Sequence, residues 1–185
     1  MGSFEPMEFV IKELDSSLVK DIHRIDDEFD IDSKFVLHLE DNRLSYTTVS
    51  IPHKTKRYPP DDFDYSTYPD DPEKGVFLAY VDGQIAGELL LRINWNKFAW
   101  VEGIGVDRKF RRMGIGRALI ARGLRWAKDN NLPGIMLETQ DNNVGACRFY
   151  ESCGFVLRGF DTGLYGASDK YRDEIALFWY LNFDK

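Results

Sequence analysis

The chain has 185 residues, of which 43% are hydrophobic and 14% aromatic, and its formal net charge is −7 at pH 7. A chain of this size can bury one hydrophobic core, so the simplest prediction is a single domain over residues 1–185. No apolar run approaches the roughly 18 residues of a membrane span. The acidic balance argues against nucleic acid as a partner, and no His or Cys spacing indicates a metal site.

The first part of the chain gives mixed signals. Residues 9–14 alternate polar and apolar side chains, which predicts a strand. A short helical stripe is predicted between residues 18 and 25, and residues 36–44 are predicted to continue the helical part. Residues 50–74 hold most of the prolines and are predicted as a long irregular loop.

The rest of the chain has stronger signals. Two apolar runs, 76–81 and 84–92, flank Asp82-Gly83, a dipeptide typical of tight β-hairpins. A further strand is predicted over 98–106. The remaining predicted elements are a helix over 115–130, a strand over 135–139, a helix over 143–153, a strand over 155–160 and a last strand near 175–181.

The two cysteines indicate a reducing compartment. Cys147 and Cys153 lie six residues apart on one predicted helix and point away from each other, so no disulfide is expected between them. The N-terminal residues lack the basic and apolar regions of a signal peptide. Reduced cysteines without an export signal predict a cytoplasmic protein.

The segment Arg111–Arg117 predicts an anion site. A predicted strand runs into it and a predicted helix leaves it, which aims unpaired N–H groups and the positive end of a helix at an anion. Gly114 and Gly116 remove the Cβ atoms that would hold a pyrophosphate away from the backbone. No Gly-Lys-Ser/Thr or three-glycine dinucleotide pattern is present. Taken alone, this loop is equally consistent with a tight turn that opens an ordinary helix.

A second motif follows in the next predicted helix and makes a family resemblance visible. The glycine loop, with Arg111 and its two glycines, is similar to the pyrophosphate loop of the GNAT superfamily of acetyl-CoA-dependent N-acetyltransferases. The second motif resembles another signature of that superfamily, in the right order and spacing. Its matching residues are Asn143, Ala146, Tyr150, Gly154 and Phe155.

Within this superfamily, the chain looks most like the streptothricin acetyltransferases of resistant bacteria. The likeness is dense from about residue 77 to the C-terminus and thin before residue 75. We therefore expect residues 1–75 to form a divergent substrate-side region and residues 76–160 an acetyl-CoA-binding core. The segments that carry the likeness include Asn94-Trp95-Asn96, 137–143, Phe149-Tyr150, 153–155, Asp161-Thr162 and 178–181.

The resemblance implies an α/β (mixed α+β) GNAT fold. Its central sheet would be mixed but mostly antiparallel, with a splayed parallel strand pair, and helices would flank it. Acetyl-CoA would be the cosubstrate, with no metal. The implied cofactor-binding residues are Ile104, Gly105, Val106, Arg111, Arg112, Met113, Gly114, Ile115, Gly116, Arg117, Asn143 and Tyr150.

Amide formation needs a base, because an amine with a pKa of about 10 is protonated near pH 7. Glu102 lies four residues before Val106 on the same face of its predicted strand, and Glu138 lies in another predicted strand. Acidic residues are unusual in strand centres, so Glu102 is the first candidate base and Glu138 the second. The alternative for each is a structural carboxylate paired with an arginine.

The leaving thiolate needs a proton, and the thioester carbonyl needs hydrogen-bond donors. The resemblance implies Tyr150 as the general acid; its alternative is a buried tyrosine bonded to a backbone carbonyl. Gly103 and Gly105 favour a β-bulge in the strand before the loop. Backbone N–H groups near Ile104 would serve the carbonyl if that strand splays as the resemblance implies.

Acidic clusters suggest a cationic acceptor. Residues 26–32 and 61–73 are rich in Asp and Glu, and aromatics in the second cluster would suit a cation-binding wall, although a solvated loop is the plainer interpretation. We predict a small polycationic amine such as streptothricin as the acceptor. The alternatives are a polyamine, a protein N-terminus, or a non-catalytic acetyl-CoA-binding regulatory module. No nucleic acid or membrane partner is expected, and monomer and homodimer both stay open. The predicted acceptor-binding residues are Asp26, Asp27, Asp30 and Trp95.

Overall fold

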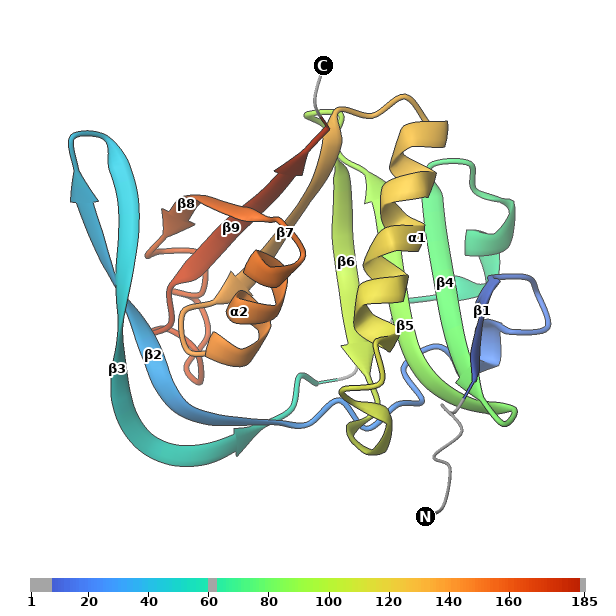
Figure 1. Cartoon of the computed structure of the whole chain (residues 1–185), viewed down its shortest axis with the longest axis horizontal. Helices are drawn as coiled ribbons and strands as arrows, with labels where there is room; N and C mark the ends of the chain where they lie inside the picture. Colours follow the sequence, from blue (N-terminus) through green and yellow to red (C-terminus); the bar gives the residue numbers. More distant parts are fainter. Residues whose placement is uncertain (1–7, 60–62, 184–185) are drawn as a thin grey trace, which may run out of the picture. The chain divides into compact units, whose positions relative to one another are not determined.

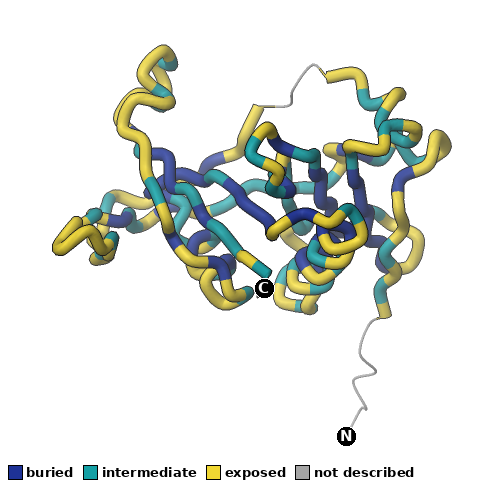
Figure 2. Tube along the Cα trace, turned by 90° about the horizontal axis from the view of Figure 1, so that it is seen from above, coloured by how far each residue is buried: buried dark blue, intermediate teal, exposed yellow. Residues whose placement is uncertain are grey.

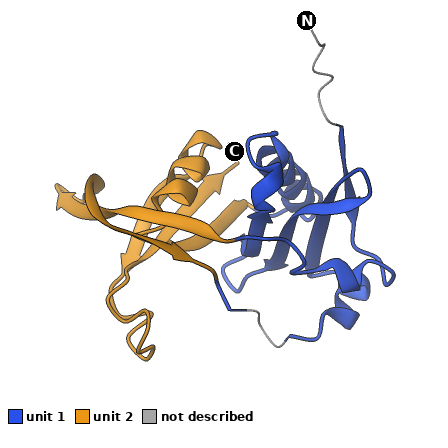
Figure 3. Cartoon of the chain, turned by 90° about the horizontal axis from the view of Figure 1, so that it is seen from below, with its two compact units in different colours: residues 1–27, 58–132 blue, residues 28–57, 133–185 orange. Residues whose placement is uncertain are grey.

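The computed structural model describes residues 8–59 and 63–183. The chain divides into two compact units, one of residues 1–27 and 58–132 and the other of residues 28–57 and 133–185 (Figure 3). Buried stretches concentrate in the strands of each unit, and the turns between strands are mostly exposed (Figure 2). Among the described residues, no helix combines the length and the hydropathy that a membrane crossing requires.

The first unit is an antiparallel sheet with a long helix packed on it (Figure 1). Its elements are β1 (Phe9–Glu13), η1 (Val19–Asp21), η2 (Tyr65–Asp70), β4 (Lys74–Val81), β5 (Gln84–Ile93), β6 (Ala99–Val106), η3 (Arg108–Phe110) and α1 (Ile115–Asp129). The strands pair in the order β1-β4-β5-β6, and α1 contacts β4, β5 and β6.

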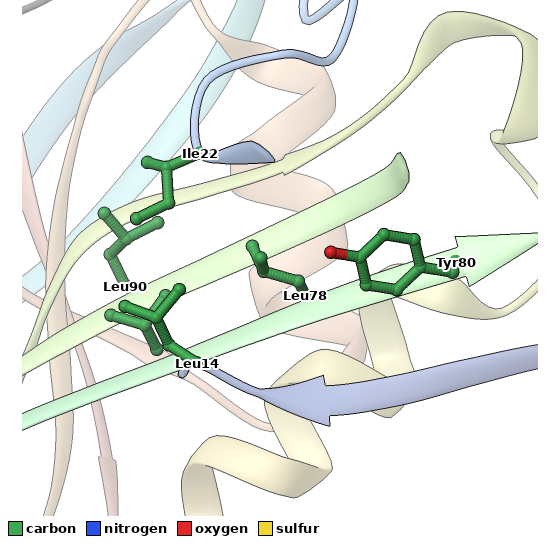
Figure 4. Packing of buried hydrophobic residues seen from close by; sticks show 6 residues of the cluster. Leu14, Ile22, Leu78, Tyr80 and Leu90 are labelled. Atoms are coloured by element: carbon green, nitrogen blue, oxygen red, sulfur yellow. The ribbon is translucent and has the colours of Figure 1, made fainter. Parts of the chain in front are cut away.

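Both faces of this sheet are apolar. Helix α1 buries a stripe at helical spacing that includes Leu119 and Trp126. A Cβ atom at Gly75 would lie 2.7 Å from Trp126 Cε2, so this glycine permits the close approach of helix and strand. A separate cluster is formed by Leu14, Ile22, Val76, Leu78, Tyr80 and Leu90 (Figure 4).

The second unit combines a long hairpin with three further antiparallel strands and one helix. Its elements are β2 (Phe29–Glu40), β3 (Arg43–Lys56), β7 (Gly134–Gln140), α2 (Val144–Ser152), β8 (Val156–Asp161) and β9 (Ala176–Asn182). Strands β2 and β3 pair with each other, and β9 pairs with both β7 and β8. The hairpin packs on α2, and its Phe35 is 1% exposed and stacks on Tyr46 at 3.9 Å between ring centroids.

The predicted strands and helices after residue 75 are confirmed, and so is the first strand, with ends that differ by one or two residues. The predicted hairpin at Asp82-Gly83 is also confirmed. Both residues have positive φ, at 47° and 77°, as a type I′ turn requires. These segments were predictable because their periodicity and turn residues are local.

Three predictions in the first 75 residues are wrong. Residues 36–44 are not helical: they form the ends of β2 and β3 around an Asp41-Asn42 turn with positive φ at both positions. Residues 18–25 contain only the short η1 turn. The predicted loop over 50–74 is largely structured, since β3 continues to Lys56 and η2 follows.

Strand β3 accommodates Pro52 because the pairing is irregular there. Ser50 pairs with Ser33 and Lys54 pairs with Ile31, so Ile51 to His53 lie opposite a register shift. A proline has no N–H to donate, and such an irregularity is where a strand tolerates it. Pro52 was therefore a misleading signal for a loop, because it lies within a strand.

Candidate active site

The predicted anion loop opens α1 in the first unit. Gly114 occupies the N-cap position with φ 84°, and Arg112 before it has φ 65°. Among the described residues, nothing lies within 4 Å of the position that a Cβ atom would take at Gly114, so the backbone can be approached there. Arg111 Nε donates to the carbonyl oxygen of Val106 at 3.1 Å, which ties the loop to the end of β6.

The loop presents polar groups outward over an apolar base. The side chain of Ile115 is 1% exposed and packs in the core under the start of the helix. The first N–H groups of a helix have no intrahelical partner, and here they belong to a segment that carries three arginines, Arg111, Arg112 and Arg117. The exposed members of the loop are Arg112, Gly114 and Arg117, and the half-buried members are Arg111, Met113 and Gly116.

Strand β6 carries the predicted bulge, and Glu102 is the extra residue. Leu90 pairs with Gly103 and Leu91 with Val101, which leaves Glu102 without a counterpart on β5. A bulge re-aims a side chain and increases local twist. Ile104, Gly105 and Val106 lie beyond the bulge, half-buried, and continue to pair with β5.

The carboxylate of Glu102 is held by cations of the first unit. Its Oε1 lies 3.0 Å from Lys74 Nζ and 3.3 Å from Arg92 Nε, and Tyr68 donates its hydroxyl to Oε2 at 3.3 Å. Burial alone would lower the pKa of Lys74, but hydrogen bonds to Glu102 and Tyr68 raise it. These contacts match the structural alternative for Glu102, a carboxylate paired with an arginine.

Glu138 has a different environment, in the second unit. It lies on β7, and its Oε1 accepts a hydrogen bond from the Tyr165 hydroxyl. Burial raises the pKa of Glu138, while the hydrogen bond from Tyr165 and the charge of Lys56 oppose that rise. A carboxylate whose pKa is moved toward neutrality is better matched to taking up a proton.

A buried ion pair lies near Glu138. Lys56 Nζ is 2.6 Å from Glu174 Oε2, and Asn142 Nδ2 donates to Glu174 Oε1 at 2.9 Å. All three side chains belong to residues that are less than a tenth exposed. Lys56, Glu174 and Tyr165 were not predicted as site residues, because no local pattern in the sequence links them to Glu138.

Helix α2 carries the second predicted motif. Asn143 is its N-cap, and its Oδ1 accepts a hydrogen bond from Ala146 N–H at 3.3 Å. Tyr150 is 7% exposed, and its ring packs against Phe155 with centroids 5.9 Å apart. Cys147 is a free thiol, and burial raises its pKa to about 12, so it is not a nucleophile near neutral pH.

The predicted acceptor residues are not all brought together. Asp26 is anchored in the first unit: its N–H donates to Asp107 Oδ2 at 3.0 Å, and its carbonyl accepts from Arg108 N–H at 2.9 Å. Asp27 follows it on this segment, which lies over β6: a Cβ atom at Gly105 would lie 2.5 Å from Ile25 Cδ1 and 3.8 Å from Asp27 Cβ. The segment therefore lies beside the end of β6 that leads to the anion loop.

Asp30 belongs to a different unit from Asp26, and Trp95 lies at the opposite end of β6 from the segment that carries Asp26. Asp30 belongs to the second unit, where its carboxylate lies 3.1 Å from His53 Nε2. Trp95 is 87% exposed in the turn before β6, at the far end of that strand from Val106. A strand rises about 3.3 Å per residue, so roughly 23 Å separates the two ends of β6. Asp61 and Asp62, from the second acidic cluster, lie outside the described residues.

The aromatics of that cluster pack on one another. Tyr65 and Tyr68 meet edge to face with centroids 4.8 Å apart, and Phe63 is 71% exposed beside them. Tyr65 also meets His23, whose Nε2 lies 2.9 Å from the tyrosine hydroxyl and whose Nδ1 lies 2.9 Å from the carboxylate of Glu88. Among residues 8–59 and 63–183, no group of three or more His, Cys, Asp or Glu could hold a metal ion.

Comparison with known proteins places this arrangement in a family. The model of the Acetyltransferase (GNAT) family matches residues 36–155. Streptothricin acetyltransferase A of Bacillus subtilis strain 168 is 36% identical over 167 residues, which cover 89% of this chain and 95% of that protein. Streptothricin acetyltransferase of Escherichia coli is 34% identical, over 84% of this chain and 86% of that protein.

A solved structure agrees with these relatives. A Bacillus anthracis protein assigned as a streptothricin acetyltransferase, in complex with acetyl coenzyme A, is 41% identical with a TM-score of 0.88. The match covers 97% of this chain and 100% of that one. The chain therefore belongs to the GNAT acetyltransferase family, and it is an acetyl-CoA-dependent N-acetyltransferase. The predicted fold class, a mixed α/β GNAT fold with a mostly antiparallel sheet, is confirmed.

Substitution of Gly114 tests the role of the loop in cofactor binding. A valine at φ 84° is strained and would place methyl groups where the pyrophosphate is predicted to approach, so we expect Gly114→Val to weaken acetyl-CoA binding at least about tenfold. Gly83→Val is a matched control, because Gly83 has φ 77° and similarly open surroundings in the β4–β5 turn. Isothermal titration should show normal affinity for Gly83→Val. Equal affinity of the two variants would remove the loop from the cofactor site.

Proposed function

We propose that this enzyme transfers the acetyl group of acetyl-CoA to a primary amine of a small polycation, namely a streptothricin. The observation that carries the proposal is the similarity to two proteins named streptothricin acetyltransferase, each matched over more than four fifths of its length. The chain's own charge of −7 and its anchored Asp26 are consistent with a cationic substrate. The acetylated nitrogen would become a neutral amide, so the product would carry one positive charge fewer than the substrate.

We assign the pyrophosphate of acetyl-CoA to the loop Arg111–Arg117 and the thioester carbonyl to backbone N–H groups of residues 104–106. The amine nitrogen attacks the thioester carbon, the C–S bond breaks, and CoA leaves as a thiolate. Tyr150 gives its hydroxyl proton to that thiolate, and the proton released by the amine goes to a carboxylate. Asn143 caps α2 and would also hold the pantetheine arm.

The contacts favour Glu138 over Glu102 as that carboxylate. Glu102 is already paired with Lys74 and Arg92, and a base held by two cations is a poor proton acceptor. Burial moves the pKa of Glu138 in the direction that proton uptake needs. We therefore assign Glu138 as the base and Glu102 as a residue that fixes the β6 bulge.

A panel of amines tests the acceptor assignment. The purified enzyme should release CoA with streptothricin at a kcat/KM at least about 100-fold above that with spermidine or with a peptide N-terminus. Since exposed charges are screened over about 8 Å at physiological salt, the KM for streptothricin should rise with salt concentration while acetyl-CoA affinity changes less. A preference for spermidine or for the peptide would transfer the assignment to a polyamine or protein N-terminal acetyltransferase.

A further inference from the structure

Glu138 is contacted by a tyrosine that belongs to neither of the family motifs. Tyr165 lies in the segment between β8 and β9, and its hydroxyl donates to Glu138 Oε1. The Nε2 of Gln140, two residues after Glu138 on β7, donates to the hydroxyl oxygen of Tyr165 at 2.9 Å. We propose that Tyr165, oriented by Gln140, is a positioning residue that keeps Glu138 ionised and fixed as the acceptor of the amine proton.

The direction of these hydrogen bonds follows from the groups involved. A side-chain amide nitrogen only donates, so the oxygen of Tyr165 is the acceptor from Gln140. A tyrosine hydroxyl has a single proton, and the neighbouring Glu138 carboxylate is its acceptor. Such a bond is charge-assisted and favours the ionised carboxylate over the protonated one.

Two other charged groups, Lys56 and Glu174, act on Glu138 through space and not through a hydrogen bond. The charge of Lys56 lowers the pKa of Glu138, that of Glu174 raises it, and the two are paired with each other at 2.6 Å. The residue paired with Glu138 on β9 is the neutral Phe178. Since burial is the largest cause and raises the pKa, the hydrogen bond from Tyr165 is the direct contact that opposes it.

This arrangement suits a base with a moderate pKa. Burial without Tyr165 would hold Glu138 protonated at a higher pH, where it could not accept a proton. The hydrogen bond from Tyr165 to one carboxylate oxygen also limits rotation of the Glu138 carboxylate. The remaining lone pairs of that carboxylate can accept the amine N–H. The proton transfer is balanced: an N–H bond of the acceptor breaks, and an O–H bond forms on Glu138.

The inference rests on the proposed role of Glu138, and Tyr165→Phe tests it. The active form of the base is the carboxylate, so kcat/KM rises with pH through the pKa of Glu138. Loss of a group that stabilises the carboxylate raises that pKa. The acidic limb of the pH profile of kcat/KM should therefore move up by about one pH unit. Below the wild-type midpoint kcat/KM should fall about tenfold, and on the plateau it should stay within about twofold.

Tyr171→Phe is the matched control. Tyr171 lies in the same segment, and its ring lies 4.6 Å from Lys56 Nζ. The wild-type limb should persist in this variant, and acetyl-CoA affinity should be unchanged in both. A ¹³C NMR titration of the Glu138 carboxyl group gives an independent readout, in which Tyr165→Phe should raise its pKa by the same amount.

The outcomes separate the two levels of the proposal. If Glu138→Gln abolishes the limb while Tyr165→Phe leaves both the limb and the carboxyl titration in place, the inference about Tyr165 is overturned and the base assignment stands. If Glu138→Gln keeps the wild-type limb, the base assignment is overturned together with the inference. A limb that moves equally in Tyr171→Phe would show a general structural effect and would overturn the role of Tyr165.

Discussion

Tyr150→Phe should lower kcat by about 100- to 10,000-fold, the usual cost of losing a general acid, and leave the Kd for acetyl-CoA within about twofold. The ring of Tyr150 is 7% exposed and packs against Phe149 and Phe155, contacts that phenylalanine retains. Only the donor hydroxyl is removed. The loss should therefore appear in turnover, because the CoA thiolate must leave without a proton.

Tyr46→Phe is the control for this experiment. The hydroxyl of Tyr46, on β3, donates to Glu151, which follows Tyr150 on α2, and burial raises the pKa of Tyr46 to about 12. Loss of this hydroxyl should affect stability but not kcat. Stopped-flow and steady-state assays at saturating acetyl-CoA would measure kcat of both variants. If kcat of Tyr150→Phe equals that of the wild type, Tyr150 is a packing residue.

Glu138→Gln should lower kcat/KM by about 100- to 10,000-fold at neutral pH and remove the acidic limb of its pH profile. The amide cannot accept the proton, so activity should recover only at high pH, where free amine accumulates. The pKa of Glu138 is raised above its usual value, mainly by burial. The wild-type limb should therefore lie above the range of an ordinary glutamate.

Glu102→Gln provides the contrast. It leaves Lys74 and Arg92 without their carboxylate, so we expect lower thermal stability and an altered β6 bulge. The acidic limb should stay at its wild-type position. A limb that disappears in Glu102→Gln and persists in Glu138→Gln would reverse the two assignments.

The glycine loop and the helix with Asn143 and Tyr150 were predictable because their signals are local. A strand, a short connection that ends at Gly114 and an apolar helical stripe follow one another within about 30 residues of sequence, and β7 is likewise followed closely by α2. The β-bulge was also indicated by Gly103 and Gly105, although the extra residue proved to be Glu102. In such segments the spacing of the apolar residues matches the repeat of the helix or strand that forms.

The hairpin of β2 and β3 was not predicted, because its apolar residues are compatible with both periods. Residues 36–44 alone resemble a helix. The hairpin is stabilised by contacts that the local sequence does not reveal: Phe35 stacks on Tyr46, and the N–H of Phe35 donates to the carbonyl of Asp141 at 2.9 Å. These are tertiary contacts. They override a weak local preference.

The environments of the two glutamates could not be predicted for a similar reason. Tyr165 is 27 residues from Glu138 in the sequence, and Lys56 is 118 residues from Glu174. Only the fold reveals that one carboxylate is paired with cations and the other is buried beside a hydroxyl. The ranking of Glu102 over Glu138 relied on strand alternation alone, which does not report partners.

Analysis of the reaction product tests the central claim most directly. Purified enzyme, acetyl-CoA and streptothricin should give a product heavier by one acetyl group, with one CoA released per product. Tandem mass spectrometry should place that group on a primary amine of the β-lysine part. Unmodified streptothricin, together with acetylated spermidine or an acetylated peptide N-terminus from the same preparation, would contradict the acceptor assignment.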